Sequence, residues 1–458
     1  MKPIYRLLIG LTLLASLHHA CGQVSFSPST IYGVSGPYSA VAVDVNGDGK
    51  LDLVCSNPGS IPSYNNNTLT VLTNNGSGVF ASNATLMAGS GPVSVVAADV
   101  NNDGKMDLIC ASARDSSLSV FTNNGSGGFV LSSSPVIGAS PDCVIAVDIN
   151  GDGNMDLICP NNTTLSVLTN DGSGGFGFNA TLNVVTGYPV SVVAADVNGD
   201  GKPDLICANA GFYPNYGNTL TVFTNNGNGE FGSNATLNVG NNPTSVKAAD
   251  VNGDGKLDLI CANQIDNTLS ILTNNGSGGF VLASSTGVDY DPVSVVATDI
   301  NGDGKLDLIC ANGGYYPNYF GTVSILTNNG SGVFGSNNTY AVGISPKTLI
   351  AADVNGDGKM DFVCSDYGND RISVLINTST FPSPTSKPSL KIKHSGNGML
   401  VSWPSVSAGW SLQQNPDLTT TDWSPSGYNG FPIADDGTNK SLIITLAKEN
   451  AFFRLLHP

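Results

Sequence analysis

The chain has 458 residues, of which 12% are charged and 55 are Gly, and its formal net charge is −17. A chain of this length exceeds one ordinary compact domain unless its architecture is repetitive. The 18 Lys and Arg residues form no basic cluster, so the composition excludes a nucleic-acid-binding protein.

Residues 1–22 have the pattern of a secretory signal peptide. Lys2 and Arg6 precede an apolar run over residues 7–17, and small residues follow at positions 20–22. A charged start, a short apolar run and a small-residue cleavage zone direct export. We therefore expect a protein that is secreted or held at the cell surface.

Lipid anchoring at Cys21 remains an alternative to simple cleavage. Against it, His18 and His19 stand where a lipobox prefers Leu and a small residue. No later apolar stretch is long enough to cross a bilayer, so no transmembrane segment is predicted.

A nine-residue acidic segment, Asp44-Val-Asn-Gly-Asp-Gly-Lys-Leu-Asp52, recurs along the chain. Further copies begin 48 to 55 residues apart, at Asp99, Asp148, Asp196, Asp250, Asp299 and Asp353. Strand-like segments flank each copy, for example residues 93–98 before it, and residues 108–111, 118–122 and 129–136 after it. Four short strands per unit of about 50 residues are typical of propeller blades. The sequence predicts an all-β fold, with a seven-bladed β-propeller over residues 23–379.

The two ends of this region predict how the ring closes. The seventh unit stops after the strand-like residues 372–377 and lacks a fourth strand, whereas residues 24–31 look like a fourth strand without a blade. Pairing them would complete the last blade and remove two free edges. Residues 380–389 are rich in Pro and Ser and read as a linker. Residues 390–458 hold all three Trp and are predicted to form a second, small C-terminal β domain, sandwich-like.

Oxygen-bearing side chains occupy positions 1, 3, 5 and 9 of every acidic segment, and the main-chain carbonyl of position 7 is a further candidate ligand. Hard oxygen donors of this kind suit Ca²⁺ better than zinc or copper. The position-6 Gly permits the sharp turn that such a loop needs. The candidate ligands are Asp44, Asn46, Asp48, Lys50 and Asp52; Asp99, Asn101, Asp103, Lys105 and Asp107; Asp148, Asn150, Asp152, Asn154 and Asp156; Asp196, Asn198, Asp200, Lys202 and Asp204; Asp250, Asn252, Asp254, Lys256 and Asp258; Asp299, Asn301, Asp303, Lys305 and Asp307; and Asp353, Asn355, Asp357, Lys359 and Asp361.

The net charge supports about seven structural calcium ions. Three carboxylates in each of seven loops account for 21 of the 35 acidic residues, and seven Ca²⁺ ions would bring −17 to about −3. Without cations such clusters would repel and raise their own pKa values. An EF-hand is the alternative calcium-binding motif closest to this pattern. It does not fit, because position 12 is Cys in place of Glu and the flanking segments are predicted to be strands.

The cysteines follow the repeat. Seven of the nine take one equivalent position in successive units: Cys55, Cys110, Cys159, Cys207, Cys261, Cys310 and Cys364. Equivalent positions on neighbouring blades are too far apart for a disulfide, so we expect small buried hydrophobes. A Cys143–Cys159 disulfide is the alternative.

Aromatic residues concentrate in the connections on the face opposite the acidic loops. Three units have elongated connections between their second and third strands, over residues 57–68, 209–219 and 312–322. Aromatic side chains on loops of a rigid scaffold suit sugar stacking or protein recognition. Packing within the long loops is the alternative reading of each residue. The candidate ligand-binding residues are Tyr64, Tyr188, Phe212, Tyr213, Tyr216, Tyr290, Tyr315, Tyr316 and Tyr319, with Tyr38 beside them.

The chain resembles FG-GAP/VCBS repeat proteins, whose propeller is similar to the integrin α-subunit headpiece. The resemblance covers residues 24–379 and rests on the acidic loop, on Phe231-Gly232 and Phe334-Gly335, and on Gly240-Asn-Asn-Pro243. It implies structural calcium between the first two strands of each blade. Residues 411–455 are similar to a small domain of exported bacterial proteins, through Ser411-Leu-Gln, Asp422-Trp423 and Phe453-Arg-Leu455.

Three functions stay open from the sequence. The leading one is a non-enzymatic recognition or adhesion module for a polysaccharide or an extracellular protein. The second is a polysaccharide lyase or hydrolase built on the propeller. Against it, all four His lie outside the propeller, Glu230 is its only Glu, and most Asp residues belong to the acidic loops. The uncommitted carboxylates considered for this role are Asp115, Asp142, Asp289 and Asp291. The third is a structural spacer at the cell surface.

Overall fold

The computed structural model describes residues 24–59, 66–184, 187–211, 214–315 and 317–380, and seven strands between residues 391 and 456. The predicted signal peptide and almost all of the predicted linker lie outside these residues. Two compact units are present, one over Ser25–Thr378 and one that contains the strands after Ser379. Among the described residues the only helical element is the 3₁₀ turn η1, Tyr367–Asn369.

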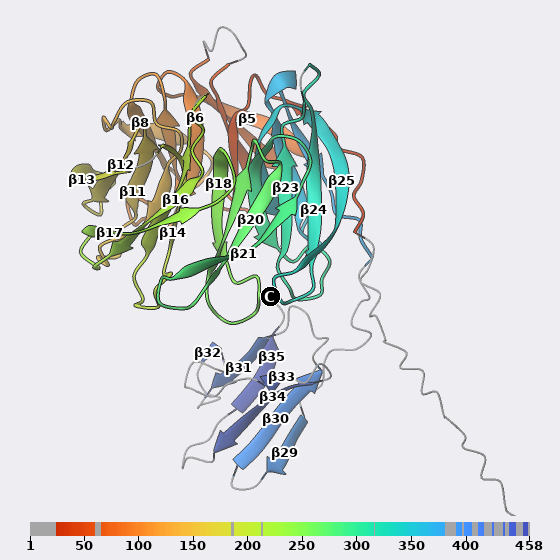
Figure 1. Cartoon of the computed structure of the whole chain (residues 1–458). Coiled ribbons are helices and arrows are strands. Elements are labelled where there is room, and N and C mark those ends of the chain that lie inside the picture. Colours follow the sequence, from red (N-terminus) through yellow and green to blue (C-terminus); the bar gives the residue numbers. More distant parts are fainter. Residues whose placement is uncertain are drawn as a thin grey trace, which may run out of the picture. The chain divides into compact units, whose positions relative to one another are not determined.

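The larger unit contains seven four-stranded antiparallel sheets, which confirms the predicted seven-bladed propeller (Figure 1). In each blade a first strand rich in Val and Ala pairs with an apolar second strand. The first strands are β2 (Ser39–Val43), β6 (Pro92–Ala98), β10 (Ile145–Val147), β14 (Tyr188–Ala195), β18 (Pro243–Ala249), β22 (Pro292–Thr298) and β26 (Pro346–Ala352). The second strands are β3 (Asp52–Asn57), β7 (Asp107–Ser112), β11 (Asp156–Asn161), β15 (Asp204–Ala210), β19 (Asp258–Asn263), β23 (Asp307–Asn312) and β27 (Asp361–Asp366).

The third and fourth strands complete each blade outward. The third strands are β4 (Thr68–Asn74), β8 (Ser117–Asn123), β12 (Thr164–Asn170), β16 (Thr219–Asn225), β20 (Thr268–Asn274), β24 (Phe320–Asn328) and β28 (Arg371–Leu375). The fourth strands are β5 (Phe80–Met87), β9 (Phe129–Ser133), β13 (Phe176–Asn183), β17 (Phe231–Asn238), β21 (Phe280–Gly287), β25 (Phe334–Ile344) and, in the seventh blade, β1 (Thr30–Gly33). Several fourth strands expose every second side chain to solvent, as expected for an outer strand.

The N-terminal strand closes the ring, as the sequence predicts. β1 pairs with β28, so the seventh sheet has the order β1-β28-β27-β26. Regular pairing begins at Thr30, later than the expected start at Val24, and Phe26 makes only an isolated bridge to Asn377. Pro28 lies between these two stretches and has no N–H to donate, which interrupts the ladder.

Apolar cores lie between neighbouring blades. One core joins Val54 and Leu69 of the first blade to Leu108, Cys110 and Phe121 of the second. The seven repeated cysteines have no exposed surface and are free thiols, as is Cys143, so the alternative Cys143–Cys159 disulfide is absent. Burial raises the pKa of the Cys55 thiol to about 12, which keeps it protonated. These cysteines therefore pack as hydrophobes.

A ring of buried Asn side chains, one at the end of each third strand or just beyond it, also joins the blades. Each Asn donates a hydrogen bond from Nδ2 to the carbonyl at position 2 of the acidic loop in the preceding blade, over 2.7 to 3.3 Å. The bond from Asn74 to Val354 joins the first blade to the seventh across 280 residues. The seven residues are Asn74, Asn123, Asn170, Asn225, Asn274, Asn328 and Asn377.

The smaller unit contains two antiparallel sheets. One has the order β29 (Lys391–Ser395), β30 (Gly398–Pro404), β34 (Asn439–Thr445) and β33 (Ala434–Asp435); the other has β32 (Ser424–Pro425), β31 (Ser411–Asn415) and β35 (Phe452–Leu456). In the part of the chain that the structure describes, no helix is long and apolar enough to span a membrane.

Candidate functional site

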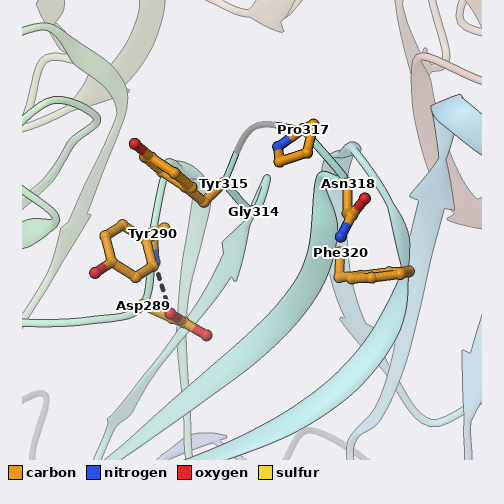
Figure 2. Close-up of a pocket in the computed structure, with 7 residues that line it drawn as sticks. All are labelled: Asp289, Tyr290, Gly314, Tyr315, Pro317, Asn318 and Phe320. Atoms are coloured by element: carbon orange, nitrogen blue, oxygen red, sulfur yellow. Dashed lines mark hydrogen bonds between the residues drawn. The ribbon is translucent and has the colours of Figure 1, made fainter.

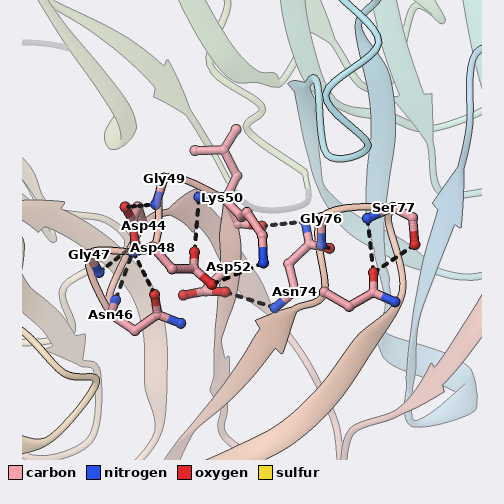
Figure 3. A network of polar contacts seen from close by, with 12 residues as sticks. Asp44, Asn46, Gly47, Asp48, Gly49, Lys50, Asp52, Asn74, Gly76 and Ser77 are labelled. Carbon is pink, nitrogen blue, oxygen red and sulfur yellow. Dashed lines mark hydrogen bonds and ion pairs between the residues drawn. The ribbon is translucent and has the colours of Figure 1, made fainter.

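Each acidic loop connects the first two strands of a blade, and backbone hydrogen bonds hold its shape. In the first loop, Asp44 accepts N–H groups from Gly47, Asp48 and Gly49, and Asn46 Oδ1 accepts the Asp48 N–H at 2.9 Å (Figure 3). The N–H of the position-6 Gly reaches the position-1 Asp at 2.7 to 2.9 Å in all seven loops. Gly49 has a φ of +80°, which explains the Gly at position 6.

The position-9 Asp anchors each loop in the protein interior. Asp52 has no exposed surface, and its Oδ2 accepts the Val45 N–H at 3.2 Å while its Oδ1 accepts the Asn74 N–H at 2.8 Å. The same two hydrogen bonds recur in the other six loops. Because Asn74 also donates to Val354 of the preceding blade, the position-9 carboxylate links its loop to the ring.

Burial raises the pKa of all seven position-9 carboxyls above the ordinary value of Asp. The carboxylates at positions 5 and 1 of the same loop raise it further, although the two backbone N–H groups oppose the shift. The pKa reaches about 7 at Asp307 and about 6 at Asp361. A cation beside these groups would reverse the direction of the shift, because it favours the ionised form.

The donor set of each loop fits a calcium ion. Three carboxylates, one amide oxygen and one main-chain carbonyl are hard oxygen ligands, and each carboxylate oxygen that accepts one N–H keeps a second lone pair. Among the described residues, however, no three acidic, Cys or His side chains converge on a common point. The fit to calcium therefore rests on the chemical type of the donors and on their order in the loop, and not on an arrangement around a common point.

Lys side chains lie beside the position-5 carboxylates. In five loops the ammonium at position 7 is 3.3 to 3.7 Å from that carboxylate, and both partners are partly exposed. Exposed pairs of this kind stabilise a protein by less than about 1 kcal/mol. The main-chain carbonyl of the same residue remains the candidate ligand.

Two neighbouring loops depart from the repeat at positions that contact each other. The second loop has Asn102 where the others have Gly at position 4, and the third has Asn154 where the others have Lys at position 7. Asn102 adopts a φ of +59°, which Asn tolerates better than most residues. Its Nδ2 donates to Asn154 Oδ1 at 2.7 Å. The two exceptions thus form one contact between blades.

The opposite face contains an open pocket formed by two connections. Tyr290 and Asp289 come from the connection before the sixth blade, and the rest of the lining comes from the long connection between β23 and β24 and from Phe320, the first residue of β24 (Figure 2). Its volume is about 340 Å³. The lining residues are Asp289, Tyr290, Gly314, Tyr315, Pro317, Asn318 and Phe320.

Aromatic rings dominate this pocket and face solvent. The ring centroids of Tyr290 and Tyr315 are 5.4 Å apart at an interplanar angle of 52°. Figure 2 shows these two rings on one side and Phe320 on the other. Tyr315 is 71% exposed, Phe320 67% and Tyr290 54%. Large exposed rings that contribute so little to a core are typical of recognition surfaces.

Main-chain hydrogen bonds hold the two connections together. The Gly314 N–H donates to the Tyr290 carbonyl at 3.1 Å and the Gly313 N–H to the Asp291 carbonyl at 2.6 Å. Within the longer connection, the Tyr319 N–H donates to the Tyr315 carbonyl at 2.9 Å. Tyr319 has a φ of +50°, an uncommon conformation for a bulky residue. The Asp289 carboxylate accepts the Thr322 hydroxyl at 2.9 Å and the Tyr290 N–H at 2.8 Å. The pocket is therefore a braced structure.

The structure brings together only some of the predicted aromatic residues. Tyr290 and Tyr315 meet at the pocket, and Tyr319 lies in its loop, whereas Tyr188 and Tyr216 lie on the fourth blade, 36% and 37% exposed. Tyr38 packs against Tyr367 with centroids 5.7 Å apart, so it has a structural role. The predictions for Tyr64, Phe212, Tyr213 and Tyr316 lie outside the described residues.

Asp289, Asn318 and Phe320 were not predicted as ligand-binding residues. The candidate set contained only aromatic side chains, and it left out Phe320 although this residue lies in the predicted connection over residues 312–322. Of the other carboxylates outside the acidic loops, Asp115 accepts the Ser90 N–H and Asp291 accepts Gln264 Nε2. Asp142 is accessible to water, yet enough protein surrounds it that burial raises its pKa to about 6.

Comparisons with known proteins agree with this architecture. The FG-GAP-like repeat model matches residues 44–110, 105–159, 148–207, 207–261, 250–310 and 299–364. BBS1N, solved in complex with ARL6DN and soaked with mercury, is 12% identical with a TM-score of 0.55, and the match covers 79% of this chain and 98% of that chain. An Agrocybe aegerita lectin, described as recognising non-reducing terminal N-acetylglucosamine, is 21% identical with a TM-score of 0.44 over 67% of this chain and 80% of that chain.

No curated protein matches the chain. At the identities above, the likeness to BBS1N shows the fold alone. The six repeat matches together span residues 44–364, well over half of the sequence. The chain therefore belongs to the FG-GAP-like repeat family.

Proposed function

We propose that this chain is an exported, calcium-stabilised recognition module that binds a polysaccharide through the aromatic pocket of the sixth blade. The observation that carries the proposal is the cluster of Tyr290, Tyr315 and Phe320, each more than half exposed around one braced pocket. Flat rings of this kind stack against the C–H face of a sugar ring.

The charges around the pocket favour a neutral sugar. Its lining contains the carboxylate of Asp289 and the amide of Asn318, both of which can accept hydrogen bonds from sugar hydroxyl groups, and no Lys or Arg is among its described residues. An anionic polymer would meet the Asp289 carboxylate without a compensating cation. We therefore propose an uncharged polysaccharide as the ligand class.

Calcium would act on the other face, as a structural ion. The side chains at positions 1, 3, 5 and 9 and the position-7 carbonyl of each loop would hold it. The ion would neutralise three neighbouring carboxylates, one of them fully buried, and so favour the folded ring. The predicted signal peptide is the basis for proposing export.

A retention assay tests the proposal. The purified protein in calcium is incubated with neutral polysaccharides such as cellulose, chitin, xylan and mannan, and with anionic alginate and polygalacturonate, and both retention and new chain ends are measured. We expect retention on a neutral polymer without new ends. Tyr315→Ala and Phe320→Ala should each weaken it by about tenfold, since about 1.4 kcal/mol of contact energy is lost.

Phe178→Ala is the matched control, because Phe178 is 61% exposed but lies on β13, in a different blade. It should leave retention unchanged. Equal loss in all three variants would contradict the pocket assignment. New chain ends would show an enzyme, and the absence of both retention and cleavage would favour a protein partner or a spacer.

A further inference from the structure

A second cavity lies at the centre of the propeller. Neighbouring first strands adjoin one another around the ring, and β26 adjoins β2. The cavity has a volume of about 540 Å³ and is lined by β2, β18, β22 and β26, with Met360 beyond the end of β26. Most of the lining is Ala, Val, Leu and Ile, and the one charged residue in it is Lys247.

The seven blades provide an internal comparison for Lys247. At the first-strand position that pairs with the residue before the repeated Cys, six blades have Val or Ile, all half-buried: Val41, Val96, Ile145, Val193, Val296 and Ile350. The fifth blade has Lys247. The next position is Ala in every blade. A single cation has therefore replaced an aliphatic side chain where nothing in the repeat requires it.

Lys247 has no protein partner that neutralises it. Its ammonium makes no hydrogen bond or ion pair within the described residues. Although water reaches the side chain, protein surrounds it, and burial lowers its pKa, with only the Cys143 thiol to oppose the shift. Lys347, at the start of β26, differs because Asp291 offsets part of the effect of burial on its pKa. Lys247 is therefore a solvent-accessible cation in a mostly apolar lining, without an anionic partner among the described residues.

We propose that this central cavity binds a small organic anion with an apolar body, and that Lys247 pairs with its charged group. The cavity also offers the hydroxyls of Ser294, Thr298 and Thr348. Ser294 Oγ accepts the Leu349 N–H at 3.3 Å and keeps its own O–H to donate. Val296, Leu349 and Ile350 would contact the apolar body. A mostly apolar cavity with a few convergent polar groups is typical of small-molecule sites.

Calorimetric titration of the full chain in calcium tests the proposal, with octanoate as the anionic probe and octanol as its neutral match. We expect octanoate to bind the wild type and to bind Lys247→Met at least about tenfold more weakly. Lys247→Arg should retain binding because it keeps the charge. Octanol should not distinguish the three proteins. Lys391→Met, a change to an exposed Lys in the smaller unit, is the control for charge alone.

Thermal melting shows that the variants are folded. Lys247→Met should melt no lower than the wild type, because it breaks no hydrogen bond or ion pair and restores the apolar character that the other blades have at this position. Equal octanoate affinity in the wild type and Lys247→Met would overturn the proposal. So would the absence of octanoate binding to the wild type, or a loss in Lys247→Arg as large as in Lys247→Met.

Discussion

The two faces of the propeller differ in how closely the blades repeat. On one face, seven acidic loops keep the same donors, the same turn and the same hydrogen bonds, with Asn102 and Asn154 as paired exceptions. On the other face, the connections between second and third strands differ in length and sequence, and one of them forms the aromatic pocket. The features that all blades share are those that hold each blade in the ring. The features that differ between blades are candidates for a function of one blade alone.

Removal of calcium should have the largest effect, because it acts on all seven loops together. A ligand at 100 times its Kd stabilises the folded state by about 2.7 kcal/mol per site, whereas domains are stable by only about 5–15 kcal/mol. We expect EDTA to lower the Tm sharply, and calcium but not magnesium to restore it, as measured by calorimetry. A melt unchanged after complete chelation would contradict structural calcium.

Loss of one buried Asn should have the next largest effect. Asn123 is 4% exposed, donates to the carbonyls of Val45 and Met106 at 2.9 Å, and accepts the Gly125 N–H. Asn123→Ala leaves these groups unsatisfied, so we expect a loss of about 3 kcal/mol in the free energy of unfolding. Its exposed neighbour is the control: Asn124→Ala should cost less than about 1 kcal/mol by urea denaturation. If both substitutions lowered the free energy of unfolding equally, the buried Asn side chains would have no special role in joining the blades.

Blade count, ring closure and the acidic loops could be predicted from sequence because they depend on local periodicity. The Asn ring was missed, although an Asn ends the third strand or follows it in every blade, because its partner lies on the adjacent blade, at a distance that strand periodicity does not encode. The same limit applies to the pocket. The sequence placed Tyr290 and Tyr315 on one face, but their contact depends on hydrogen bonds between two loops.

Lys247 shows a different limit of prediction from sequence. Its position in the strand could be read from the repeat, but the cavity exists only once the first strands close into a ring. A comparison of equivalent positions, blade by blade, would have singled it out. A residue that departs from the repeat can therefore indicate a candidate binding site even where the sequence contains no known binding motif.

The smallest effect should come from the paired exceptions among the acidic loops. Asn102→Gly and Asn154→Ala each remove the 2.7 Å hydrogen bond between the second and third blades. A double-mutant cycle should give a coupling of about 0.5–1 kcal/mol, because the bond is exposed. Strictly additive effects would show that the two substitutions in the repeat are unrelated.

The central claim is that the acidic loops stabilise the propeller while the aromatic pocket binds the ligand. It is tested most directly by the polysaccharide retention of two variants at a temperature where both are folded. Asp204→Asn changes a fully buried loop carboxylate, and Tyr315→Ala changes a ring that is 71% exposed. We predict that Asp204→Asn melts earlier but is retained like the wild type, whereas Tyr315→Ala melts like the wild type and loses retention. Loss of retention in the folded Asp204→Asn protein, with full retention of Tyr315→Ala, would contradict the account.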